Sequence, residues 1–169
     1  MKKFYNILLC ILIISFMFSS CSSGEEAPSG GDSGDTTGDT TTATIWNGSK
    51  MTFTKADGAD HTQADNQDRL TSNVWITRAS GGGQIFNIVK ENAANQGTSP
   101  VGTTWAIGDI NDIDNLTFRS FRPAVGKPKQ AVGKNLVMHL TEDNIYLSVK
   151  FTSWSQNKRG GFAYERSQP

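Results

Sequence analysis

The stretch from residue 136 to residue 151 constrains the fold of this chain more than any other part of its sequence. It contains two runs of alternating character, LVMHL and IYLSVKF, on either side of Glu142 and Asp143. A hairpin centred on these two acidic residues gathers the large apolar side chains on one face, in the pairs Leu140–Ile145, Met138–Leu147 and Leu136–Val149. A slip of one residue would mix the two faces, so the pattern predicts a single register and an antiparallel sheet.

The opposite face of this hairpin is more polar, and it places His139 across from Tyr146. Such a pair most often serves cross-strand packing alone. We retain both residues as candidate ligand-binding residues on that face.

Short β-rich runs separated by turn residues continue along the chain. Asn47-Gly48 suits the two central positions of a type I′ turn, so a further hairpin is predicted that pairs Trp46 with Ser49 and places Trp46 in the core. The other predicted strands lie at 74–77, 84–89, 103–107, 116–121 and 162–164. No segment has a sustained helical period, so we expect an all-β fold: a single antiparallel β-sandwich, with a jelly-roll arrangement favoured over an immunoglobulin-like one.

The N-terminus has the features of a targeting signal. Two lysines precede an apolar run at 7–18, which is too short to span a bilayer as a helix and is typical of a secretory signal peptide. The sequence FSSC at 18–21 resembles a bacterial lipobox, although Phe18 stands where that motif usually has leucine. The resemblance implies a lipid on Cys21, which makes the membrane a partner of the mature protein.

The segment at 22–43 contains only Ser, Gly, Asp, Thr, Glu, Pro and Ala. It has no large apolar side chain to bury, so we expect a disordered tether. Its start, SSGEE at 22–26, resembles the acidic export signal of lipoproteins of Bacteroidota, which implies an outer-membrane protein that faces outward. The expected organisation is a signal peptide at 1–20, the lipidated Cys21 and tether at 21–43, and a β-sandwich domain at 44–169.

The globular part carries a small positive charge that the whole chain hides. The chain has sixteen basic and sixteen acidic residues, but five of the acidic residues lie in the tether and two lysines lie in the signal peptide. The domain at 44–169 is therefore +3. This excess is too small to suggest a nucleic-acid binder, and we expect no nucleic-acid partner.

Several short motifs of the domain are similar to a module found in secreted and surface proteins of Bacteroidota and other environmental bacteria. They include VWITR at 74–78, FTSW at 151–154 and GGFAY at 160–164. The similarity extends over nearly all of residues 46–166. It implies an extracellular β domain and carries over no activity and no site.

Four carboxylates gather in one loop, at Asp57, Asp60, Asp65 and Asp68. Closely spaced carboxylates and backbone carbonyls are the oxygen ligands that Ca²⁺ prefers, so this loop is the candidate metal site. Asp and Asn also favour turns by bonding their own backbone, which explains the same crowding without a metal. We expect no other cofactor.

Aromatic and basic residues supply the remaining candidates for binding. Trp75 and Trp154 are the tryptophans best placed for partial exposure, where an indole ring can stack on a sugar, although packing in the core or between the sheets is the favoured explanation for both. The stretch from Phe118 to Lys129 interleaves aromatic side chains with cations, a pattern that fits a polyanionic glycan or a solvated loop.

No motif for catalysis stands out. The sequence Gly-x-Ser-x-Gly is absent and only two histidines are present, so a hydrolytic triad is not predicted. We expect a surface lipoprotein with a non-enzymatic binding or adhesion-type domain, for an extracellular glycan or a surface protein. The alternative is a small carbohydrate-active enzyme that uses paired carboxylates.

Overall fold

The computed structural model of the protein describes residues 42–169. The signal peptide, Cys21 and most of the tether lie outside these residues and stay predictions. The described strands are β1 (Thr44–Trp46), β2 (Lys50–Lys55), β3 (Asp68–Arg69), β4 (Trp75–Arg78), β5 (Ile85–Asn87), β6 (Thr103–Ile107), β7 (Leu136–Leu140), β8 (Ile145–Trp154) and β9 (Phe162–Ser167). The helical elements are η1 (Ala64–Asn66), η2 (Ile110–Asn115), α1 (Phe121–Val125) and η3 (Pro128–Ala131). Within 42–169, no helix has the length and apolar character needed to cross a membrane.

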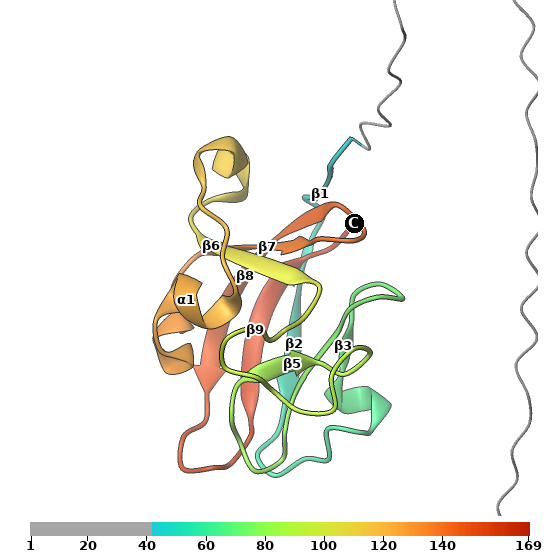
Figure 1. The fold of residues 1–169 in the computed structure, drawn as a ribbon, viewed down its shortest axis with the longest axis vertical. Coiled ribbons are helices and arrows are strands. Elements are labelled where there is room, and N and C mark those ends of the chain that lie inside the picture. The colour runs from blue at the N-terminus through green and yellow to red at the C-terminus, as the bar shows by residue number, and fades with distance from the viewer. Residues whose placement is uncertain (1–41) are drawn as a thin grey trace, which may run out of the picture. The chain divides into compact units, whose positions relative to one another are not determined.

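The larger sheet has the strand order β2-β9-β8-β7-β6, and β1 joins it by pairing with β8 (Figure 1). Its β7–β8 hairpin has the predicted register, with the pairs Leu140–Ile145, Met138–Leu147 and Leu136–Val149. β8 continues beyond Phe151 to Trp154 and then turns back into β9, which contains the strand predicted at 162–164. The alternating pattern of residues 136–151 therefore fixes the centre of this sheet.

The predicted hairpin through Asn47-Gly48 is wrong, although both of its strands exist. β1 pairs in parallel with β8, and β2 pairs in antiparallel fashion with β9. Between β1 and β2 the chain crosses the end of β9, where the Gly48 amide donates to the Gln168 carbonyl oxygen at 3.0 Å. A Cβ atom at Gly48 would collide with the Pro169 carbonyl oxygen. Glycine is needed here for a close backbone approach and not for the positive φ of a type I′ turn.

The predicted strand at 116–121 is also wrong. Within residues 116–121, only Arg119 pairs with a strand. It forms an isolated antiparallel bridge with Trp105 of β6, with two backbone hydrogen bonds of 2.7 and 2.9 Å. The chain then enters the short helix α1, whose first turn tolerates Pro123 because a proline there lacks only an amide that the helix leaves unpaired. Phe121 is buried, with its ring centroid 5.0 Å from that of Trp105. Phe121 therefore enters the core from a helix and not from a strand.

The all-β class with two sheets is confirmed, and the smaller sheet has the order β3-β4-β5. The finer topology differs from the jelly roll that was favoured. A jelly roll is built from two Greek keys, whereas β6 to β9 follow one another across a single sheet. Short turns join β3 to β4, β4 to β5, β7 to β8 and β8 to β9, whereas β1 and β2 pair with strands that lie far later in the chain.

The core lies between the two sheets and is rich in aromatic rings. Trp105, Phe151 and Phe162 are almost completely buried, and Trp46 is buried as predicted. Strands of the smaller sheet contribute Ile76 and Ile85 to the same cluster. One hydrophobic core therefore serves both sheets.

A buried polar network joins the two sheets beside this core. Asp68 of β3 accepts hydrogen bonds from Nε and Nη2 of Arg166 on β9, at 2.8 and 2.9 Å. The Tyr164 hydroxyl donates to the same carboxylate at 2.6 Å. Burial, together with the charge of Asp68, raises the pKa of Tyr164 well above its usual range. The phenol therefore stays neutral in the folded protein.

We predict that Tyr164→Phe changes the alkaline limb of the stability profile. Below about pH 10 the phenol is neutral in both states, and above it only the unfolded chain loses the proton, so this residue lowers stability as pH rises. The variant should lose about 1–3 kcal/mol at neutral pH, because a donor to a buried carboxylate is removed. It should then show a shallower decline above about pH 10.

Urea unfolding of both proteins across the alkaline range measures this change. Tyr146→Phe is the matched control, since its half-exposed hydroxyl lies outside the network. It should change the free energy of unfolding by less than about 0.5 kcal/mol. Parallel alkaline limbs for wild type and Tyr164→Phe would contradict the assignment.

Candidate functional site

A pocket of about 290 Å³ lies where the β8–β9 turn meets the segment from α1 to η3. Its lining includes half-buried Trp154 and the polar side chains of Gln156 and Asn157. Its charged residues are all cations: Arg78, Arg122, Lys127, Lys129 and Lys158. We call this hollow the basic pocket.

Local turn chemistry holds the walls of the basic pocket in place. Asn157 and Lys158 take φ values of 57° and 58°, which turns the chain back toward β9. On the other wall, Pro128 begins η3, and the Lys127 amide donates to the Gln130 side chain at 2.9 Å. The lysines at 127, 129 and 158 are exposed, so their ammonium groups are free to reach a ligand.

Arg78 forms the buried back of the basic pocket, with 4% of its surface exposed. Its guanidinium donates to three backbone carbonyls, those of Gly83 (2.9 Å), Ser155 (3.0 Å) and Gly161 (2.7 Å). Burial lowers its pKa to about 10, while the charge of Asp57 acts in the opposite direction. Arg78 is therefore still a cation at neutral pH, without a carboxylate bonded to it.

Trp154, a candidate for sugar stacking, is half-buried and packed against protein groups in this pocket. The Arg78 guanidinium lies over its ring, 4.1 Å from the centroid. The rings of Phe121, Phe151 and Phe162 pack around it as well. One face of the indole is already covered, so Trp154 lines the pocket as a partly exposed apolar wall.

The electrostatics of the basic pocket favour an anion. In residues 42–169 the ion pairs are Lys90–Glu142, Arg159–Asp57 and Arg166–Asp68, and none of them uses a cation of this pocket. Arg122 is held through its Nε, which donates to Gln84 at 3.1 Å. A bound oxyanion would offset part of this positive charge and would accept charge-assisted hydrogen bonds. The planar guanidinium of an arginine can donate two such bonds to one oxyanion.

Three of the four aspartates of the candidate metal loop have partners within the protein. Asp57 pairs with Arg159, Asp60 accepts from the amide and hydroxyl of Thr62, and Asp68 is held in the buried network. Asp65 lies in η1. Over the part of the chain that the structure describes, no group of three or more potential metal ligands is assembled. Calcium binding stays a prediction.

Asp57 and Asp60 instead face a buried cation. Lys55 is 1% exposed, and its ammonium donates to the Ala59 carbonyl at 2.6 Å. Burial and the nearby Arg78 lower the pKa of Lys55, while the charges of Asp60 and Asp57 raise it. The crowding of carboxylates in this loop therefore has an electrostatic explanation that needs no metal.

His139 and Tyr146 form the predicted cross-strand pair, away from the basic pocket. Their rings are stacked, with centroids 4.1 Å apart and an angle of 5° between the planes. Phe118 packs edge-on against both rings. These two candidate ligand-binding residues are half-buried and are not joined to Trp75 or Trp154 by any contact among the described residues.

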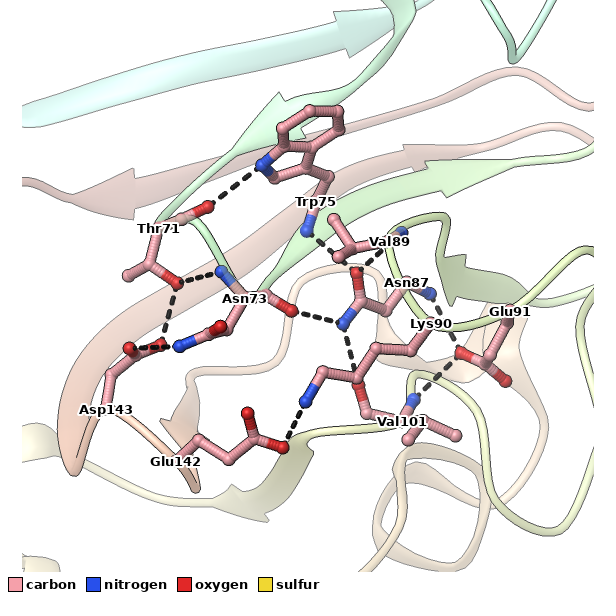
Figure 2. A network of polar contacts seen from close by, with 10 residues as sticks. All are labelled: Thr71, Asn73, Trp75, Asn87, Val89, Lys90, Glu91, Val101, Glu142 and Asp143. Carbon is pink, nitrogen blue, oxygen red and sulfur yellow. Dashed lines mark hydrogen bonds and ion pairs between the residues drawn. The ribbon is translucent and has the colours of Figure 1, made fainter.

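Trp75 belongs to a polar network that fixes the loops of the smaller sheet (Figure 2). Its indole nitrogen donates to the Thr71 carbonyl at 2.9 Å, and the Arg69 guanidinium lies 4.0 Å from its ring centroid. Asp143, in the β7–β8 turn, accepts from Thr71 and Asn73 in the same network. Trp75 is thus a half-buried part of a structural junction.

Asn87 is the centre of this junction, and its side chain is fully buried. Its oxygen accepts from the amides of Trp75 (2.9 Å) and Val89 (3.2 Å). Its nitrogen donates to the carbonyls of Asn73 (2.8 Å) and Val101 (2.9 Å), as Figure 2 shows. All four hydrogen-bonding positions of the carboxamide are therefore occupied.

Part of the basic pocket can be recognised in the sequence. Lys127, Lys129 and Arg122 lie in the stretch that was noted for interleaved cations and aromatics, and Trp154 was a candidate. Arg78 and Lys158 were missed, because only the fold brings β4 and the β8–β9 turn to this stretch. No protein-family model, no curated protein and no solved structure matches the chain.

We predict that Asn87→Ala lowers the free energy of unfolding by at least about 3 kcal/mol, because it leaves several buried backbone groups without partners. Asn87→Asp keeps the shape of the side chain but cannot donate to the two carbonyls, so it should also be strongly destabilised. Asn92→Ala, at an exposed asparagine, is the control. Urea midpoints measure the effect, and a wild-type midpoint for Asn87→Asp would show that the network is not required.

Proposed function

We propose that this protein is an outer-membrane surface lipoprotein whose β-sandwich domain binds an anionic extracellular glycan in the basic pocket. The observation that supports this proposal is the lining itself, which combines five cations with no carboxylate. Sulfate esters and uronic acid carboxylates are the anionic groups that such polysaccharides carry. The role is one of binding or adhesion, without catalysis.

The position of the basic pocket in the domain supports the proposal. The chain enters the domain through β1, which pairs with the Ile145–Leu147 end of β8. Trp154 and the turn that lines the pocket lie at the other end of this strand, about 30 Å away at ~3.3 Å per residue. In Figure 1 these two ends lie at the top and the bottom of the view. The chain therefore enters the described domain at the end of β8 opposite the basic pocket.

The composition of the pocket also favours binding over the alternative of hydrolysis by paired carboxylates. A glycosidase needs two carboxyl groups across the scissile bond, about 5–9.5 Å apart. The lining of the basic pocket offers ammonium and guanidinium groups in their place.

We predict that the double variant Lys127→Ala/Lys129→Ala binds dextran sulfate or polygalacturonate about tenfold more weakly than wild type, as expected for the loss of two exposed charge pairs. Binding should weaken further as salt is added, because the contacts are solvent-exposed. Titration calorimetry of the full chain in detergent measures both effects, with neutral dextran as the ligand control.

The variant control is Arg119→Ala/Lys134→Ala, which removes the same charge from residues outside the basic pocket. It should bind like wild type. Equal losses in the two double variants would indicate attraction to the net charge of the domain and would contradict a defined site.

The anchor is tested separately. Cys21→Ser should abolish fatty-acid labelling and release the protein from the membrane fraction, because the thiol is the only group through which the proposed lipid is attached. Metabolic labelling with a fatty-acid analogue, followed by fractionation, measures this. The variant should keep the urea midpoint of wild type, and equal labelling of the two proteins would exclude the lipid on Cys21.

A further inference from the structure

A second hollow lies on the outer face of the larger sheet, distinct from the basic pocket. Its volume is about 340 Å³, within the range of about 300–1,000 Å³ for small-molecule sites. Its floor is formed by residues 148–150 of β8, and its walls are the β1–β2 crossing at 46–48 and the segment at 108–111. We call it the amide pocket, because three asparagines line it: Asn47, Asn111 and Asn135.

Each wall of the amide pocket contains a glycine in close contact with a neighbouring group. Gly48 carries the chain across the end of β9 at a distance that excludes a side chain. Gly108 has a φ of 156°, and a Cβ atom there would collide with Cδ2 of Leu116. Asp109 then begins η2 by accepting from the Asn111 amide at 2.9 Å. The pocket is therefore built before any ligand arrives.

Several polar side chains around the amide pocket have no protein partner. Within residues 42–169, the side chains of Asn47 and Asn135 make no hydrogen bond, and those of Lys50 and Lys150 make neither a hydrogen bond nor an ion pair. All four are exposed. By contrast, the carboxamides of Asn87 and Asn111 are used inside the protein.

We propose that the amide pocket binds a neutral sugar residue. A carboxamide both donates and accepts, as does the Ser148 hydroxyl, so these groups match the paired hydroxyls of a sugar ring. The carboxylate of Asp109 in the same lining offsets one of the two lysine charges, so this pocket is much less cationic than the basic pocket. This chemistry differs from that of the basic pocket, which has no carboxylate, and the inference does not depend on the function proposed for that pocket.

The test is saturation-transfer NMR of the full chain with cellohexaose, maltohexaose, xylohexaose and mannohexaose, in a detergent without a sugar headgroup. At least one of these neutral oligosaccharides should bind. Asn47→Ala and Asn135→Ala should each weaken that binding about fivefold, the effect of one lost hydrogen bond. Asn92→Ala, an exposed asparagine outside the pocket, should have no effect.

The variants of the basic pocket separate the two sites. Lys127→Ala/Lys129→Ala should leave the binding of the neutral oligosaccharide unchanged, whatever its effect on dextran sulfate. Urea midpoints identify any variant that fails to fold. Absence of binding by all four oligosaccharides, or binding that survives both asparagine variants, would overturn the proposal.

Discussion

The buried carboxylate of Asp68 is the interaction on which the arrangement of the two sheets depends. Asp68 belongs to the smaller sheet. Its carboxylate accepts hydrogen bonds from Nε and Nη2 of Arg166 and from the hydroxyl of Tyr164, both of which belong to the larger sheet. A buried charge is costly unless its partner is present, so separating the sheets would expose or orphan three groups at once. The apolar core drives the sheets together, and this network determines where β3 lies against β9.

How far the sequence predicts the fold depends on whether local or distant contacts decide each element. The β7–β8 hairpin was predicted to the residue, because an alternating pattern on both strands leaves one acceptable register. The Asn47-Gly48 hairpin failed because the end of β9, more than a hundred residues later, lies between its two strands. No local signal in residues 43–54 carries that information.

In the basic pocket, too, some residues can be recognised from the local sequence and others only from the folded chain. Its lysines at 127 and 129 stand beside aromatic residues in the sequence and could be noted there. Arg78 could not, because its role follows from burial behind Trp154 and from three backbone carbonyls that only the folded chain supplies. The acidic loop is ambiguous in the sequence, because carboxylates such as Asp57 and Asp60, which lie near buried Lys55, are spaced as closely as carboxylates that bind calcium.

The parallel pairing of β1 with β8 has a mechanical consequence. If the chain is held through the residues before Thr44 while a ligand pulls on the Trp154 end, tension runs along β8. β1 enters from the held end and runs in the same direction as β8, so the tension acts along their shared axis. The three residue pairs between β1 and β8 then bear the force simultaneously, in shear. In a hairpin pulled apart from one end, the pairs would instead break one after another. Such a domain resists detachment best in the direction in which an adhesive contact would pull it.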